Sequence, residues 1–69
     1  MQRNMAPETA SDREAVQRLM RQLHGYAHGL GLDDATVRQI VERVIADLPN
    51  ADDVHRQAEA RQWMLLAAR

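Results

Sequence analysis

The sequence predicts an all-α fold, a single small domain of three helices. Apolar residues recur at steps of three and four positions in three successive segments, and no segment shows the alternation of period two that marks a strand. The predicted helices span residues 12–30, 34–48 and 52–68, and residues 11–69 form one helical domain. Residues 1–10 are polar, contain Pro7 and show no period, so we expect a flexible N-terminal tail.

The first predicted helix begins at a capping box formed by Ser11 and Glu14, whose side chains can each satisfy a free backbone N–H at the helix start. Gly29 or Gly31 is expected to adopt the left-handed conformation that closes this helix. Between these ends lies one continuous apolar stripe: Val16, Leu19, Met20, Leu23, Ala27 and Leu30.

The second predicted helix is capped by Asp33 or Asp34 and ends before Pro49. Its core-facing stripe consists of Val37, Ile40, Val41, Val44, Ile45 and Leu48.

The third predicted helix, capped within residues 50–53, does not carry one clear apolar face. Trp63 projects opposite a stripe that we expect to face the core, so that the segment WMLLAA is apolar nearly all round. An exposed indole here, flanked by Met64, Leu66 and Ala67, predicts a surface for self-association or a partner. Burial of the indole by the first two helices is the alternative. The stripe expected to face the core consists of Val54, Ala58, Leu65 and Ala68.

The amino-acid composition excludes several classes of function. With 69 residues and no Phe, the core must be aliphatic, and chains of this size net only ~3–5 kcal/mol from their own core, which favours association. The absence of Cys excludes disulfides and thiolate metal sites. Nine basic residues, all Arg, against 10 acids provide no long-range attraction to nucleic acid or to a membrane. No apolar run predicts a membrane span or a signal peptide, so we expect a cytoplasmic protein.

The stretch LHGYAHGLGLDD, residues 23–34, resembles a functional site but has a simpler interpretation. His24 and His28 have the spacing of a zinc-binding pair, yet HExxH is absent, and we expect both to flank the apolar stripe without facing a cleft. The glycines match no phosphate-binding motif. Paired aspartates stand where helix caps are required. We therefore predict no catalytic residue, no cofactor and no metal site, and a protein that is not an enzyme.

Arg18 and Arg21 lie on the outer face of the first predicted helix, beside Gln17 and Gln22. Arginine and glutamine can contact phosphates and base edges. Two arginines without a basic background are more typical of a solvated face, so direct nucleic-acid binding stays an alternative.

The order of motifs resembles region two of the extracytoplasmic-function sigma factors, over about residues 14–69. LHGYAHGL, from Leu23, resembles the run in their first conserved helix, and QIVERVI, from Gln39, loosely resembles their second. RQWMLLAAR, from Arg61, matches their third most closely. The resemblance implies that the second helix contacts the clamp helices of RNA polymerase, through Gln39, Glu42 and Arg43.

Departures from the family limit this implication. Family members continue beyond the tryptophan-containing helix with residues that melt the promoter, whereas this sequence ends at Arg69, and Gln39 and Arg43 replace acids. A sigma-like fragment, decoy or regulator is therefore expected, rather than a complete factor.

The leading hypothesis is a non-enzymatic interaction module acting through a helix surface, with RNA polymerase as a candidate partner. The alternatives are a homodimeric helical bundle with a structural role and a helix-turn-helix DNA-binding protein with its turn at Gly31–Asp34.

Overall fold

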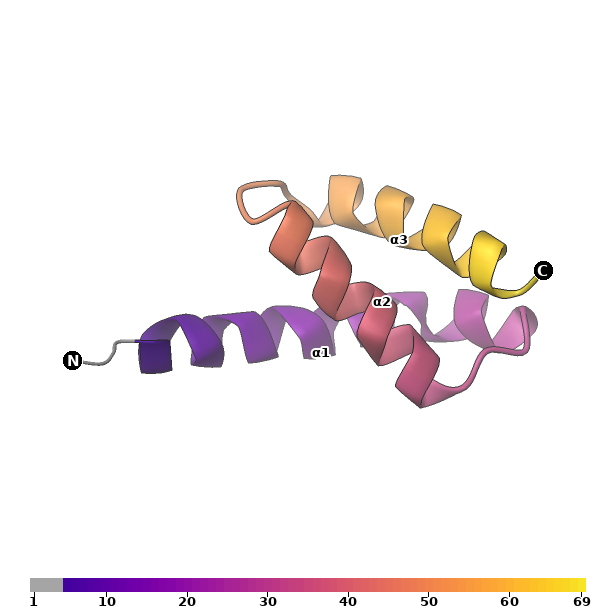
Figure 1. Cartoon of the computed structure of the whole chain (residues 1–69), viewed down its shortest axis with the longest axis horizontal. Helices are drawn as coiled ribbons and strands as arrows, with labels where there is room; N and C mark the ends of the chain where they lie inside the picture. The colour runs from indigo at the N-terminus through magenta and orange to yellow at the C-terminus, as the bar shows by residue number, and fades with distance from the viewer. Residues whose placement is uncertain (1–4) are drawn as a thin grey trace.

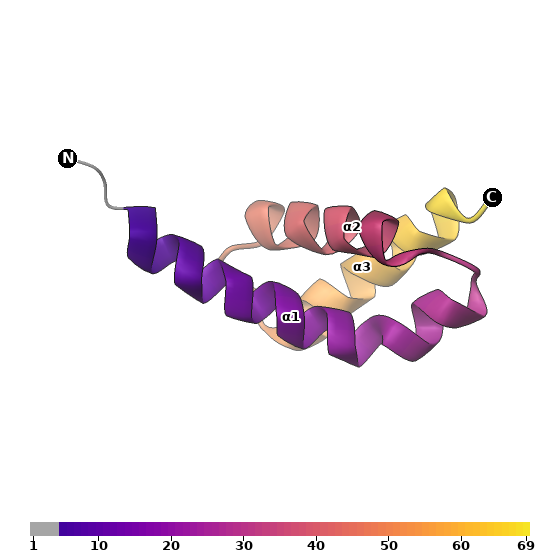
Figure 2. The ribbon, with the colours of Figure 1, turned by 90° about the horizontal axis from the view of Figure 1, so that it is seen from below.

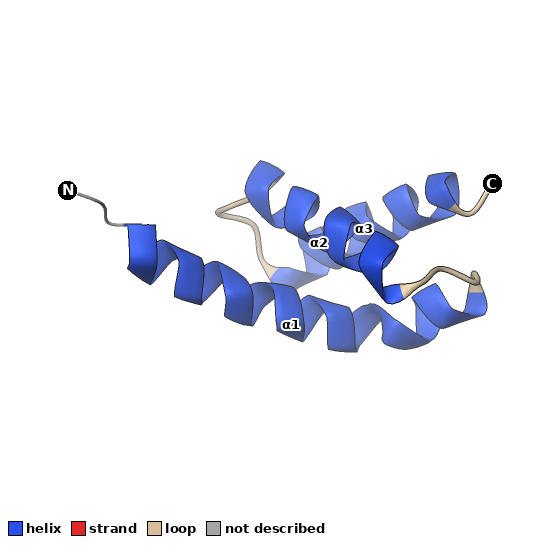
Figure 3. Cartoon of the chain, turned by 60° about the horizontal axis from the view of Figure 1, so that its bottom comes forward, coloured by secondary structure: helices blue, strands red, loops and turns tan. Residues whose placement is uncertain are grey.

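Three helices connected by short turns make up the fold in a computed structural model that describes residues 5–69, with side chains from Arg13 onward. Helix α1 spans Met5–Gly29, α2 spans Asp34–Asp47 and α3 spans Asp53–Ala67 (Figure 1). No strand occurs in the described part of the chain (Figure 3). The predicted all-α fold is confirmed.

Helices α1 and α3 run in the same direction, and α2 crosses them in the opposite sense (Figures 1 and 2). Two side-chain hydrogen bonds join α1 to α3 in parallel register. Arg18 donates to Asp53, and Gln57 donates to Gln22, and the partners in each pair are 35 residues apart in the sequence. The beginning of α1 projects beyond the other two helices, which gives the molecule its extent of 43 × 21 × 18 Å.

The predicted stripes of the first two helices are confirmed as the core. Ile40 and Leu48 of α2, and Met20 and Leu30 from the first stripe, are partly buried against it. The buried members come from all three helices: Ala15, Val16, Leu19, Leu23, Ala27, Val37, Val41, Val44, Ile45, Ala60 and Met64.

The helix ends show why these segments stop where they do. The end of α1 is a Schellman motif, in which the Leu32 N–H donates to the Ala27 carbonyl at 3.1 Å and the Gly31 N–H to that of His28 at 3.0 Å. Gly31 has φ 77°, so it is the left-handed residue. Asp33 caps α2 by accepting from the Thr36 N–H, and Asp52 caps α3 by accepting from the His55 N–H.

Helix α1 begins earlier than predicted, at Met5. Ser11 is therefore inside the helix and does not cap it. Pro7 is compatible with this start because the N–H groups of a first helical turn need no intrahelical acceptor. Part of the predicted tail, residues 1–4, lies outside the described residues, and the flexibility of the tail stays a prediction.

The face that α3 turns to the core differs from the predicted one. Val54 and Leu65 are exposed, whereas Arg56, Ala60 and Met64 are buried. The expected core stripe is therefore wrong: the buried stripe lies between that face and the Trp63 side. Within residues 5–69, no helix combines the length and apolarity needed to cross a bilayer.

Candidate interaction site

The last turns of α3 expose three large apolar side chains, which we call the α3 apolar surface. Trp63 is 39% exposed, Leu65 49% and Leu66 57%. The indole Nε1 donates to Glu59 Oε2 at 3.1 Å, one helical turn earlier, so its polar atom is satisfied while part of the ring remains in solvent. A group of apolar side chains near one helix end is a feature of interaction sites.

Met64 does not belong to this surface. Its side chain is fully buried among the core residues, so the prediction that it flanks Trp63 on an exposed surface is wrong. The periodicity of α3 explains the error, because WMLLAA is apolar on every side and offers no polar face that would orient the helix. Leu65, which was predicted to face the core, takes its place on the surface.

Polar contacts determine how α3 is oriented. Arg18 Nε lies 2.7 Å from Asp53 Oδ2, and Arg18 Nη2 lies 3.3 Å from Asp53 Oδ1, which joins the start of α3 to α1. The hydrogen bond from Arg18 lowers the pKa of Asp53, and Asp53 raises the pKa of Arg18. On the other flank, Arg56 donates to the Leu48 carbonyl at 3.0 Å and to the Pro49 carbonyl at 2.9 Å.

Arg56 has a structural role that was not predicted from the sequence. One sequence signal could have indicated this role. Arg56 lies about one helical turn after the capping residue Asp52, and the second helix ends before Pro49, so the arginine is close to the end of that helix. The guanidinium satisfies carbonyls at the C-terminal end of α2, where a positive charge is favoured by the helix dipole.

The two arginines considered for nucleic-acid contact do not form one patch. Arg18 is held by Asp53 on α3, whereas Arg21 is exposed and lines a groove beside α2. A phosphate contact through Arg18 would require this ion pair to open, which weakens the nucleic-acid alternative.

The outer face of α2 presents Gln39, Glu42 and Arg43, all three exposed. Arg43 Nε lies 3.2 Å from Asp47 Oδ2, an ion pair along the same face. These side chains lie away from the core stripe of α2, and this face carries both signs of charge.

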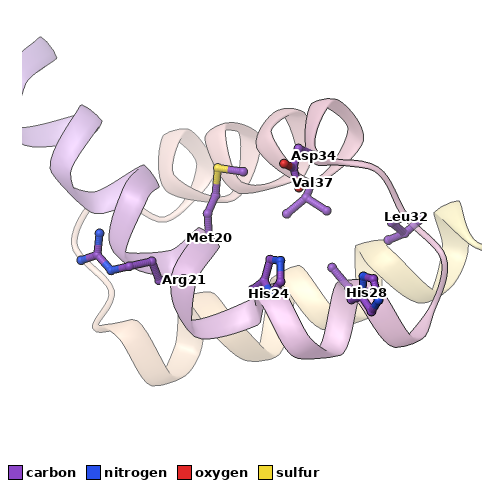
Figure 4. A pocket seen from close by; sticks show the side chains of 8 residues that line it. Met20, Arg21, His24, His28, Leu32, Asp34 and Val37 are labelled. Carbon is purple, nitrogen blue, oxygen red and sulfur yellow. The ribbon is translucent and has the colours of Figure 1, made fainter.

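His24 and His28 occupy a different place from the one expected. They line an open groove of about 390 Å³ between α1 and α2, with their rings stacked at a centroid distance of 6.0 Å (Figure 4). The expectation that they face no cleft is therefore wrong. Among the side chains described, no three His, Asp or Glu residues are arranged to hold a metal ion.

Comparisons with known proteins identify no relative of this chain. No family model, no curated protein and no solved structure matches this chain.

Proposed function

We propose that this chain is a non-enzymatic helical interaction module that binds a protein partner through the α3 apolar surface. The observation that carries the proposal is the exposure of Trp63, Leu65 and Leu66 within four consecutive residues of one helix end. Single exposed apolar residues are common on protein surfaces, but such a group favours association because covering it removes apolar area from water. Tryptophan is also enriched among the residues that dominate binding energy.

RNA polymerase is the first partner to test, with the module acting in the cytoplasm as a sigma-like regulator or decoy. The exposure of Gln39, Glu42 and Arg43 supports this finer proposal, because a helix contact needs these side chains free of the core. A second copy of the chain is the other candidate partner. The same apolar surface supports it, since a thin core gains stability from association.

Light scattering of the chain alone and with RNA polymerase tests these proposals. We expect a complex with polymerase, weakened about tenfold or more by Leu66→Arg because a charge replaces buried apolar area. Val54→Arg is the matched control, since Val54 is 71% exposed near the other end of the same helix. Glu42→Arg should weaken polymerase binding selectively, while Glu14→Arg, at another exposed position, should leave it unchanged.

The outcomes separate the candidates. A concentration-dependent dimer that Leu66→Arg abolishes would favour self-association over the polymerase proposal. Two outcomes would contradict an interaction through the α3 apolar surface. In the first, the chain stays monomeric and does not bind polymerase. In the second, a complex forms, but neither Leu66→Arg nor Val54→Arg weakens it. Circular dichroism of each variant checks that the helices are intact.

A further inference from the structure

The groove between α1 and α2 contains a methionine sulfur and is separate from the α3 apolar surface. The Met20 side chain extends from α1 toward α2, with its sulfur near the tip, and lines the groove together with Val37 and Asp34 of α2 (Figure 4). We propose that Met20 is a modification site, at which a peroxide oxidises the thioether to a sulfoxide and thereby loosens the packing of α1 on α2.

The position of Met20 leaves it accessible to a small oxidant. Met20 is partly buried, and it lines an open groove of about 390 Å³, which admits several water-sized molecules. Hydrogen peroxide is only one oxygen atom larger than water. The other methionine with a described side chain, Met64, is 0% exposed in the core. An oxidant can therefore reach Met20 in the folded chain, whereas Met64 becomes accessible only when the helices separate.

The reaction needs only the thioether and the oxidant. The sulfur lone pair attacks one oxygen of hydrogen peroxide, the O–O bond breaks as the S–O bond forms, and proton transfer releases water. Sulfur loses two electrons and the peroxide gains them, so atoms and electrons balance. Methionine sulfoxide reductases reverse this oxidation, so the modification can serve as a switch.

Oxidation of Met20 should weaken the contact between the first two helices. Met20 packs against the core, and the α2 wall of the groove includes Val37, a buried core residue. A sulfoxide places a polar oxygen on this apolar side chain. The imidazoles at the groove, those of His24 and His28, belong to α1, whereas the polar side chain from α2 is the carboxylate of Asp34, which repels a partly negative oxygen. The oxidised side chain is therefore favoured against α1 or in solvent and disfavoured against α2.

Treatment of the full chain with hydrogen peroxide, followed by peptide mass spectrometry, tests the modification site. We expect Met20 to be oxidised at least about tenfold faster than Met64 in the folded chain, because only Met20 lines the groove. In urea, where the chain is unfolded, the two rates should become similar. Differential scanning fluorimetry should show that the melting temperature falls by about 5 °C once Met20 is oxidised.

Met20→Leu is the matched control, because leucine retains the apolar volume, does not form a sulfoxide and leaves the other methionines in place. The same peroxide treatment should leave the melting temperature of this variant unchanged, and circular dichroism verifies its helix content. Three results would overturn the proposal. They are oxidation of Met64 as fast as that of Met20 in the folded chain, an unchanged melting temperature after Met20 is oxidised, and an equal fall in Met20→Leu.

Discussion

The charged side chain of Arg56 is buried and connects α3 to the C-terminal end of α2. Only 9% of the residue is exposed, and its guanidinium reaches two consecutive carbonyls, those of Leu48 and Pro49. Both hydrogen bonds are partly buried, so they are only partly exposed to competing water, and the arginine stabilises the turn between α2 and α3. Together with the Arg18–Asp53 ion pair, it orients α3.

Arg56→Met should lower the free energy of unfolding by about 1–2 kcal/mol, because the apolar side chain fills the space but donates to neither carbonyl, and the Leu48 carbonyl keeps only the Ala51 N–H at 3.3 Å. Urea denaturation followed by circular dichroism measures the change. Arg61→Met, on the same helix, is the control and should change stability by less than about 0.5 kcal/mol. Equal effects of the two variants would show that the carbonyl contacts of Arg56 do not stabilise the fold.

His24 and His28 allow a prediction about zinc. We expect equimolar zinc to leave the melting temperature unchanged, because two imidazoles without a third ligand hold zinc weakly and add little linkage stabilisation. Differential scanning fluorimetry of the parent and of His24→Ala makes the comparison. A rise in melting temperature that His24→Ala abolishes would contradict this prediction and would show that the two histidines take part in a zinc site.

At the scale of helix α1, its glycines can be separated by backbone conformation. A Cβ added at Gly25 meets no atom within 4 Å, and Gly25 lies inside the helix, so Gly25→Ala should raise stability by about 0.5–1 kcal/mol. Gly31 also has free space, but its φ of 77° strains any L side chain, so Gly31→Ala should lower stability by about 1 kcal/mol. Thermal melts test the opposite signs. A destabilising Gly25→Ala would contradict the helical geometry at that position.

The aspartate caps of α2 and α3 make stability depend on pH. The hydrogen bonds from Thr36 lower the pKa of Asp33, and those from His55 lower the pKa of Asp52. Because these folded-state values lie below the unfolded ones, the stabilisation is complete above the ordinary value of 3.8 and is lost as the pH falls through the folded-state values.

The double variant Asp33→Asn, Asp52→Asn tests this pH dependence. Asparagine retains the capping acceptor but does not titrate, so the urea midpoint of the variant should fall less than that of the parent between pH 5 and pH 2. At pH 7 both proteins should show similar helix content. Parallel declines of the two midpoints would contradict a contribution from the caps.

At the scale of the whole molecule, stability rests on a small aliphatic core shared by three helices. Leu23 is almost fully buried, so Leu23→Ala should cost about 2–4 kcal/mol, a large share of the stability of so small a domain. Leu65→Ala is the matched control: Leu65 is 49% exposed, and the same truncation there should cost much less. Urea denaturation compares the two, and similar losses would contradict the orientation of α3.

Much of the fold was predictable because local signals agreed with tertiary packing. The stripes of α1 and α2 appear in the core as predicted, and Asp33 and Gly31 are at their expected helix ends. The candidate site was less predictable. Trp63 and Leu66 are exposed as expected, but the positions of Met64 and Leu65 were interchanged.

Local sequence signals were enough to predict the number of helices, the inward faces of α1 and α2 and most of the helix ends, but not the start of α1 at Met5. They could do so because a strong 3.6-residue period and a capping side chain act within one or two turns. The tertiary structure alone decided how α3 is oriented and where the groove lies. The last turns of α3 are apolar on every side and have no preferred face, so contacts with distant residues, Asp53 with Arg18 and Arg56 with the end of α2, orient the helix.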